Sequence, residues 1–514
     1  MNVPSRLGDL ILAALRRWPD RLALVDETHR LSYGELEQRI ATALGIFGRL
    51  GLRPGDTVAQ LSGNRNEMFC IMAAAYIGGF RSVTLHPVAG ANDHAAILDD
   101  CRPALVVGES PYAERLAWLK ERCVRVGHWR SHDTGDGLPP FWQEAHAAEP
   151  AAQVRGEPED IIRLAYTGGT TGKPKGVMLS NRAMAANARL WLEGLEWPDG
   201  VRCLCSAPIS HGAGSLIYPT LARGGTVYLQ RGFSAERWLA TVQAEGINTT
   251  FIVPTMIYAL LDHPATRGAD LSSLRALVYG AAPISPPRIR EALSVFGPVL
   301  VQTYGQTEAP NTILILDQAA HAAADEARLA SAGRPFPGLD VRLLDDLNQP
   351  AAAGQIGEIC VRGPLLMSGY HNAADETAAT LRDGWLHTGD LARQDDDGYF
   401  YLVDRRKDLI ISGGFNIYPR EIEDVLATHP EVHASAVIGI PDAKWGEAVK
   451  AIVVRRGERI QPQELIDYIR ARKGSVHAPK SVDFVDALPL TGLGKPDKRA
   501  LRQRYWHQQD REIA

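Results

Sequence analysis

The sequence predicts an α/β fold, with a large N-terminal domain of mostly parallel sheets covered by helices and a small, mobile α+β lid domain at the C-terminal end. Short runs of β-branched residues alternate with helical patterns over most of the chain, which is typical of parallel sheets. The length of 514 residues allows about three or four structural units. After Gly398 the pattern changes, and a dense charge cluster at 404–408 separates two β-rich segments.

The first elements follow from periodicity. Asp9, Arg16 and Arg17 interrupt the apolar residues of segment 1–17, so we expect an amphipathic helix there and no signal peptide. The longest apolar stretch, 68–80, is shorter than the roughly 20 residues of a membrane span, and we expect a buried helix. Buried strands are expected at 57–61, 104–107, 161–166, 201–207, 226–229, 250–253 and 276–279, with helices at 182–193, 235–245 and 286–296.

In the rest of the chain the expected strands and helices alternate less regularly. Residues 131–160 should form a polar connector, and the Ala-rich segment 317–330 an exposed helix. The last elements should be strands at 399–403 and 409–412, a helix from Pro419, two short strands, and a helix at 462–472. We therefore place an N-terminal domain at 1–403, a hinge at 404–408 and a lid domain at 409–514.

Composition excludes some classes of function. The net charge is -5, from 55 basic and 60 acidic residues, which argues against binding to nucleic acid or to a membrane surface. The six cysteines include no C-x-x-C pair, so we expect reduced thiols in a cytoplasmic protein. Cys203 and Cys205 should face one side of a buried strand, without a role in metal binding.

The strongest local signal is the segment YTGGTTGKPKGV at 166–177, which follows a predicted strand. Glycines let the backbone approach an anion, threonines donate hydrogen bonds, and lysines supply charge. A loop that only bends would need neither the threonines nor the lysines. It is not a Walker loop, because Thr167 replaces the first glycine and Pro174 the magnesium-binding hydroxyl. The predicted phosphate-binding residues are Thr167, Gly168, Gly169, Thr170, Thr171, Gly172 and Lys175.

This loop resembles the phosphate loop of the adenylate-forming superfamily, which includes acyl-CoA synthetases, synthetase adenylation domains and firefly-type luciferases. Further motifs match that family in order: GAAP at 280–283, YGQTE at 304–308, TGD at 388–390, DRRKD at 404–408, ISGGFNIYPREIE at 411–423 and LPLTGLGK at 488–495.

The resemblance implies a role for each motif around the nucleotide. Tyr304 and Gly305 would lie beside adenine, Thr307 would contact the α-phosphate, and Glu308 would hold magnesium. Gly280, Ala281 and Ala282 would line the adenine and the acyl pocket. Asp390 would accept both ribose hydroxyls, a task for which a charged acceptor is well suited.

The lid motifs imply movement. Arg405 would contact the ribose or a phosphate, and Lys407 would be the pivot of the lid. Gly413 and Gly414 would border the tunnel for the pantetheine arm of coenzyme A, and Lys495 would be the catalytic lysine. Read alone, a charge run is usually a solvated surface, and a lysine on a glycine-flanked loop is usually inert.

The segment 208–215 resembles the part of the family that opens the acyl site, with His211 at its mouth; a histidine facing the core is the alternative. It has no Asp, which argues against α-amino acid substrates, and no Arg or Lys follows before Thr220, which argues against dicarboxylates. The sequence therefore predicts an apolar monocarboxylate.

The implied cofactors are ATP, Mg²⁺ and coenzyme A. We expect formation of an acyl-adenylate with release of pyrophosphate, followed by acyl transfer to coenzyme A. An amide-forming ligase, or a stand-alone enzyme loading a carrier protein, would show the same adenylation motifs. A regulator that only binds nucleotide would lack Lys495 or Glu308, and both are present.

Overall fold

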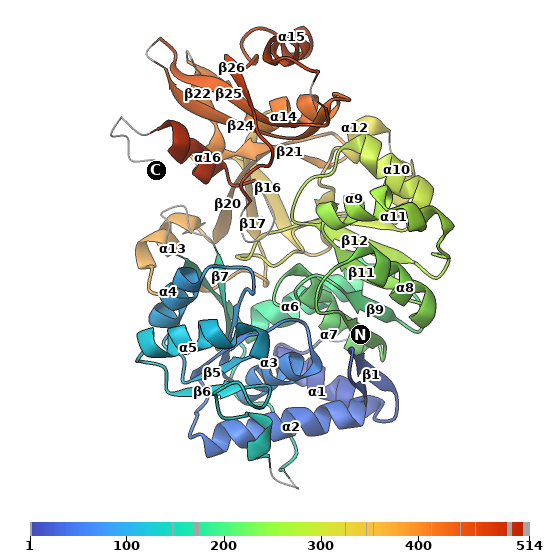
Figure 1. The fold of residues 1–514 in the computed structure, drawn as a ribbon, viewed down its shortest axis with the longest axis vertical. Helices are drawn as coiled ribbons and strands as arrows, with labels where there is room; N and C mark the ends of the chain where they lie inside the picture. Colours follow the sequence, from blue (N-terminus) through green and yellow to red (C-terminus); the bar gives the residue numbers. More distant parts are fainter. Residues whose placement is uncertain are drawn as a thin grey trace.

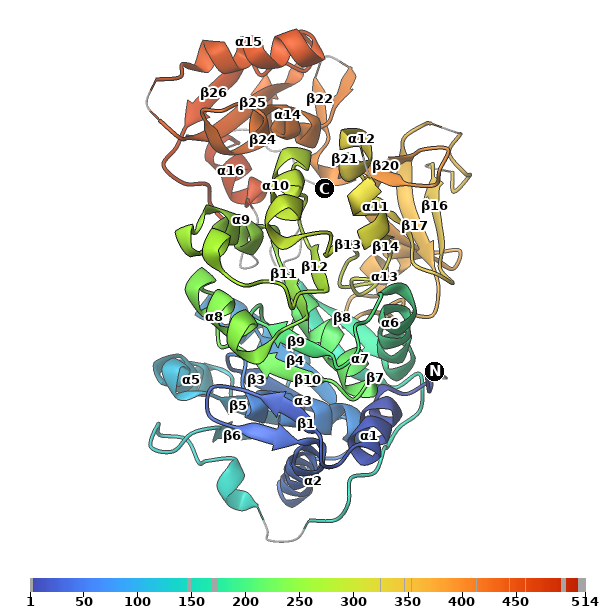
Figure 2. The same cartoon turned by 90° about the vertical axis from the view of Figure 1, so that its right-hand side faces the viewer.

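The computed structural model describes residues 3–145, 149–167, 174–323, 325–345, 347–352, 354–412, 414–442, 444–457, 459–490 and 496–506. The described residues form four sheets. Three of them belong to the larger, N-terminal part, and the fourth lies with its helices at one end of the molecule (Figures 1 and 2).

The first two sheets are mainly parallel, as predicted. One has the order β18 (Gly369–Tyr370), β8 (Lys175–Ser180), β7 (Ile161–Thr167), β4 (Arg81–Leu85), β3 (Thr57–Leu61), β5 (Leu105–Gly108), β6 (His128–Ser131). The other has the order β15 (Arg334–Pro335), β14 (Leu314–Leu316), β13 (Leu300–Tyr304), β12 (Ala276–Gly280), β11 (Thr249–Ile252), β9 (Arg202–Cys205), β10 (Thr226–Leu229), β1 (Leu22–Val25), β2 (Arg30–Ser32). Antiparallel strands occur at their edges, at β18 and β8 in the first sheet and at β14, β15 and β2 in the second.

The main core connects these two sheets. Every residue of α3 (Asn66–Gly78) is buried, which confirms the buried helix expected from its continuous apolar sequence. One hydrophobic cluster joins strands of both sheets to α1 (Leu7–Arg17), α2 (Tyr33–Arg49), α3, α6 (Asn181–Gly194) and α7 (Ile217–Ala222). The remaining helices of this part are α4 (Ala91–Cys101), α5 (Ala113–Arg122), α8 (Ala235–Glu245), α9 (Pro254–Asp262), α10 (Pro286–Phe296), α11 (Gln318–Ala323), α12 (Glu326–Leu329) and α13 (Ala374–Thr380).

The third sheet is antiparallel and was not predicted as a sheet. It contains β16 (Asp340–Leu344), β17 (Gly357–Arg362), β19 (Leu381–Arg382), β20 (Trp385–Gln394) and β21 (Phe400–Arg405). A 3-10 turn, Arg406–Asp408, then leads directly into the fourth sheet.

The fourth sheet and three helices make the α+β part at the C-terminal end. Its strands are β22 (Ile410–Ser412), β23 (Phe415–Ile417), β24 (Val432–Asp442), β25 (Gly446–Arg455) and β26 (Ser481–Phe484), and its helices are α14 (Pro419–Ala427), α15 (Pro462–Lys473) and α16 (Lys498–Tyr505). This architecture confirms the predicted fold class; the domain boundaries themselves stay a prediction.

Two local expectations were wrong. The segment 317–330 forms two short helices, α11 and α12, instead of one; most of its described residues are exposed or half-buried as expected, but His321, whose ring packs on Tyr279, and Leu329 are buried. The two short strands expected after α14 are the long strands β24 and β25, of 11 and 10 residues.

The cysteines behave as expected. All six thiols are free and buried, and Cys203 and Cys205 belong to one hydrophobic cluster while Leu204 belongs to another. Within the part of the chain that the structure describes, none of the helices has the length and apolar character needed to cross a membrane.

Candidate active site

The site is built where β12 and β13 end, at the carboxyl edge of the second sheet, the usual ligand edge of α/β folds. Gly280 is required here, because a Cβ atom would lie 2.5 Å from the Thr303 carbonyl oxygen on the neighbouring strand. The next residue, Ala281, has φ 71°, a left-handed conformation that costs a non-glycine residue about 1–2 kcal/mol. The backbone therefore changes direction at the strand end.

Asp390, on β20, is the meeting point of several predicted residues. The residue is 7% exposed. Its carboxylate oxygen Oδ2 accepts hydrogen bonds from the Tyr304 hydroxyl (2.7 Å) and from Gln306 Nε2 (2.8 Å). Arg405 Nε lies 3.1 Å from Oδ1. Burial raises the pKa of Tyr304, and the adjacent Asp390 raises it further, so the phenol stays neutral.

The turn after Tyr304 brings Glu308 close to the phosphate-loop strand. Gly305 allows this turn, since a Cβ atom there would lie 2.6 Å from the backbone of Asn311. The Tyr370 hydroxyl donates to Glu308 Oε1 at 2.8 Å, and Lys175 Nζ lies 5.6 Å from the centre of the Tyr370 ring. Thr307 is half-buried in the same turn. Carboxylate oxygens are the ligands that Mg²⁺ prefers, so Glu308 has suitable chemistry for holding this ion.

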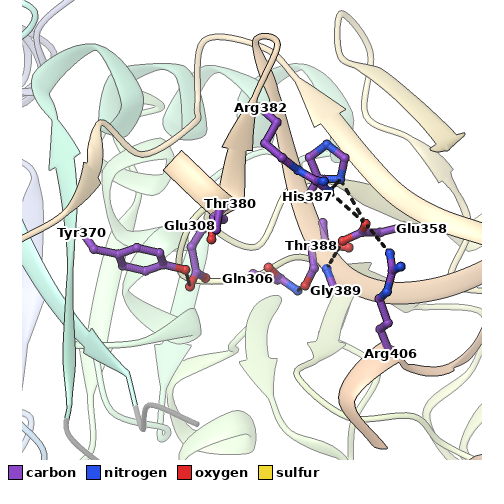
Figure 3. Close-up of a pocket in the computed structure, with 11 residues that line it drawn as sticks. Gln306, Glu308, Glu358, Tyr370, Thr380, Arg382, His387, Thr388, Gly389 and Arg406 are labelled. Atoms are coloured by element: carbon purple, nitrogen blue, oxygen red, sulfur yellow. Dashed lines mark hydrogen bonds and ion pairs between the residues drawn. The ribbon is translucent and has the colours of Figure 1, made fainter. Parts of the chain in front are cut away.

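A cavity of about 430 Å³ opens beside these residues. Figure 3 shows Glu308 and Tyr370 on one side and Glu358 on the other. The lining residues are Gln306, Glu308, Glu358, Tyr370, Ala379, Thr380, Arg382, His387, Thr388, Gly389 and Arg406.

Glu358, on β17, faces several of the other lining residues (Figure 3). Its Oε1 accepts the backbone N–H of Gly389 at 2.7 Å, and its Oε2 lies 3.0 Å from His387 Nδ1. Guanidinium nitrogens of Arg406 and Arg382 lie 3.6 and 3.8 Å from the same oxygen.

Glu358, His387 and Cys360 also have possible metal-ligating atoms within 4.8 Å of one another. The two guanidinium groups already balance the Glu358 carboxylate, and burial raises the pKa of the Cys360 thiol to about 12. A metal would meet positive charge and a protonated thiol, so the cluster is better suited to an ion-pair network.

His211 precedes a 3-10 turn at 212–216, and its Nδ1 lies 2.8 Å from Ser210 Oγ. Its ring packs edge-on against His86, with centroids 4.9 Å apart. Burial lowers the pKa of His211 to about 3, with smaller contributions from His86 and Arg163, so the ring is neutral near pH 7. Arg163 Nη2 donates to the Ser210 carbonyl at 2.6 Å. An arginine from a distant strand therefore reaches this segment, which the local sequence did not indicate.

Several predicted residues lie at the edge of, or outside, the described chain. Thr167 ends β7 and pairs with Lys175 on β8. Gly414 has φ 82° just before β23, and a Cβ atom there would meet nothing within 4 Å. Of Lys407 only the backbone is described. Gly168, Gly169, Thr170, Thr171, Gly172, Gly413 and Lys495 lie outside the described residues.

Sequence reasoning missed Tyr370, Glu358, Arg382 and Arg406 as site residues. Tyr370 stands on a two-residue strand and Arg382 on another, so neither had a periodic context. Gln306 and Arg406 stood inside quoted motifs and His387 directly precedes the motif at 388–390, so their positions next to predicted site residues were the available signal.

Comparison with known proteins gives a consistent result. A family model described as AMP-binding enzyme matches residues 12–371, and one described as AMP-binding enzyme C-terminal domain matches residues 421–495. The medium/long-chain-fatty-acid–CoA ligase FadD8 of Mycobacterium tuberculosis is 42% identical, over 100% of this chain and 92% of the relative. A feruloyl-CoA synthase from an Amycolatopsis species is 39% identical, over 97% and 99%. Among solved structures, the amide bond synthetase McbA from Marinactinospora thermotolerans superposes with a TM-score of 0.90 at 33% identity, covering 97% of this chain and 100% of that one.

Proposed function

Because the chain belongs to the AMP-binding enzyme family, we propose that it activates an apolar monocarboxylic acid with ATP and passes the acyl group to coenzyme A. The acid would attack the α-phosphate of ATP, giving an acyl-adenylate and pyrophosphate. The thiol would then attack the acyl carbon and release AMP. The observation that carries this proposal is the convergence of Tyr304, Gln306 and Arg405 on Asp390, beside Glu308.

The first step needs positioning and charge stabilisation more than proton transfer. A carboxylate is already ionised and needs no general base, but its oxide is a poor leaving group until AMP replaces it. Glu308 would hold Mg²⁺, which would neutralise charge on the phosphates. Thr307, Lys175, the 167–172 loop and Lys495 would supply fixed donors and positive charge around the transferring phosphorus.

The nucleoside would occupy the edge of β13 and β20. The Asp390 carboxylate, which now accepts Tyr304 and Gln306, would accept the ribose hydroxyls, with Arg405 holding its second oxygen. The strained turn at Ala281 and the close approach at Gly280 would shape the adenine side.

Two observations favour an apolar acid. His211 is neutral near pH 7, so it offers no positive charge to a second carboxylate. Fatty acids and ferulate, which appear in the names of the relatives, are also monocarboxylates with largely apolar bodies.

The acceptor is the part that most needs an experiment. Coenzyme A is supported by the relatives and by basic side chains on the lid, such as Lys480, whose Nζ lies 5.6 Å from the ring of the half-exposed Trp445. Transfer to an amine is the second candidate, because McbA, whose fold this chain shares, is named an amide bond synthetase. Loading of a carrier protein uses the same first step.

The test is a pyrophosphate-release screen over carboxylic acids of graded size. Each accepted acid is then incubated with coenzyme A or with a panel of amines, and products are weighed by mass spectrometry. We expect a thioester with coenzyme A. An enzyme that forms amides readily and never a thioester would contradict the acceptor, and failure of every acid to release pyrophosphate would contradict the activation step.

A further inference from the structure

We infer that Glu358 is a positioning residue that anchors the N-terminal side of the hinge through Arg406, so that the lid turns at position 407 and not earlier in the chain. This inference rests on the proposed function only in assuming that the lid moves between the two half-reactions. Its structural basis is the distribution of ion pairs on the two sides of the 406–408 turn.

The upstream side of the turn is held twice by the large domain. Arg405 pairs with Asp390 on β20, at 3.1 Å, and Arg406 pairs with Glu358 on β17, at 3.6 Å. Asp390 and Glu358 are 7% and 6% exposed, so both acceptors are fixed in the third sheet. Consecutive side chains therefore bind two different strands, which restrains the backbone at 405–406 in rotation as well as in position.

The downstream side is held by the lid. Asp408 Oδ1 lies 2.9 Å from Arg502 Nη1 on α16, and both side chains are largely buried. The chain then enters β22 within two residues. Residue 407 lies between these two sets of ion pairs. One further bond crosses the boundary in this structure, because Asp404 Oδ2 on β21 accepts the backbone N–H of Arg420 on α14 at 2.9 Å, and the lid must break it when it turns.

Glu358 also joins this hinge anchor to the nucleotide site. The same carboxylate that faces Arg406 through Oε2 accepts the N–H of Gly389 through Oε1, and Gly389 directly precedes Asp390 (Figure 3). Arg382 and His387 also face Oε2, so the carboxylate keeps partners if Arg406 is removed. Loss of Arg406 should consequently loosen the hinge while leaving the Gly389–Asp390 segment in place.

Limited trypsin digestion of the full, substrate-free chain tests the anchor, since trypsin cleaves after arginine and lysine and the turn contains Arg405, Arg406 and Lys407 in sequence. In Glu358→Gln, cleavage within 405–407 should be about fivefold faster than in wild type, because local opening loses one ion pair. Arg406→Gln should accelerate cleavage after Lys407 similarly, and Arg406→Lys should restore part of the protection.

Arg342→Gln is the matched control. Arg342 stands on the same sheet in an exposed ion pair, at 2.9 Å, with Asp340, a residue outside the 406–408 turn, so hinge cleavage should remain at the wild-type rate. The double variant Glu358→Gln/Arg406→Gln should be cleaved more slowly than the product of the two single accelerations predicts, because the pair that both variants remove is lost only once. An acceleration equal to that product would overturn the pairing. Unchanged cleavage in both single variants would overturn the anchor.

Kinetics separates anchoring from direct nucleotide binding. Arg406→Gln should lower kcat for the complete reaction about fivefold and change KM for ATP less than about twofold. A rise in KM for ATP with unchanged hinge cleavage would make Arg406 a nucleotide ligand and overturn the inference. The digestion needs no substrate, so its result does not depend on whether coenzyme A is the acceptor.

Discussion

At the scale of single residues, the site depends on carboxylates with different partners. Asp390 accepts two neutral donors and one guanidinium, Glu358 faces two guanidinium groups, and Glu308 accepts one tyrosine hydroxyl. Among these three, Glu308 therefore has the least compensated charge in the described contacts and is the best placed to meet a cation.

Replacing Glu308 by Gln should weaken the use of magnesium without unfolding the protein. The amide oxygen can still accept the Tyr370 hydroxyl, so the local packing is preserved. We expect at least about a tenfold rise in the Mg²⁺ concentration that gives half-maximal pyrophosphate release, the scale of losing a metal-site contact. A Tyr401→Phe variant, which removes a tyrosine–carboxylate bond to Asp395 outside the cavity, is the control. Unaltered magnesium dependence would remove Glu308 from the metal's ligands.

His321 gives a pH dependence whose sign can be worked out. It is buried, its Nδ1 bonds to the Asp317 carbonyl at 2.8 Å, and its Nε2 lies 2.9 Å from the Tyr279 hydroxyl. Burial lowers its pKa from 6.5 to about 4, so the folded protein holds the neutral ring. This contribution to stability is complete above pH 6.5 and is lost as pH falls toward 4, at about 1.4 kcal/mol per pH unit.

Thermal unfolding between pH 7 and pH 5 checks this. His321→Gln removes the titrating ring, so its Tm should fall less over that interval than the wild-type Tm, even if it starts lower. His433→Gln, at an exposed position, should follow the wild-type curve. Equal losses of Tm in His321→Gln and wild type would show that His321 is not responsible.

At the scale of elements, the sequence was informative where strands are buried and separated by helices. The limits expected for β3, β10, α8 and α10 agree with the observed Thr57–Leu61, Thr226–Leu229, Ala235–Glu245 and Pro286–Phe296. The third sheet was missed because β19 has two residues, too few for periodicity, and because its strands pair antiparallel, with only the short helix α13 between β17 and β19. Asp390 could still be predicted from its motif, but Glu358 on the same sheet could not.

Gly280 tests the contact between β12 and β13. A methyl group in Gly280→Ala would lie 2.5 Å from the Thr303 carbonyl, so the strands must separate at the site, at a cost of about 1–3 kcal/mol. We expect a lower free energy of unfolding and a higher KM for ATP. Gly268→Ala is the control, because a Cβ atom there meets nothing within 4 Å. Chemical denaturation measures the free energy of unfolding, and steady-state kinetics measures KM for ATP. Equal values of both quantities in Gly280→Ala and Gly268→Ala would refute the packing argument.

At the scale of the whole molecule, the third and fourth sheets are joined through one short turn, 406–408, and the cavity lies beside it. The change of sequence pattern near Gly398 and the charge cluster at 404–408 predicted a domain boundary near this turn, and that boundary stays a prediction. The sequence could not show that Arg405 and Arg406 bind different strands, since those partners lie far away in the chain. Such non-local ion pairs arise only once the sheets are assembled.

Movement of the lid should separate the two half-reactions, and Gly414 is the residue at which to test it. We predict that Gly414→Leu blocks the path of the pantetheine arm, and so abolishes thioester formation while sparing pyrophosphate release, because ATP and the acid bind elsewhere. The residue has φ 82°, so any side chain adds backbone strain of about 1–2 kcal/mol. Gly414→Ala has the same strain with little bulk and is the matched control.

Lys495→Ala completes this comparison from the opposite side. If Lys495 supplies positive charge only to the first transition state, its loss should reduce acyl-adenylate formation by about two orders of magnitude or more, the scale of losing one preorganised donor. Thioester formation from supplied acyl-adenylate should survive. Lys495→Ala should therefore fail in the first half-reaction, measured as pyrophosphate release. Gly414→Leu should fail in the second, measured as acyl-CoA formed from synthetic acyl-adenylate. If both variants lose both half-reactions equally while remaining folded, the lid does not present different faces to the two steps, and one fixed arrangement must serve both.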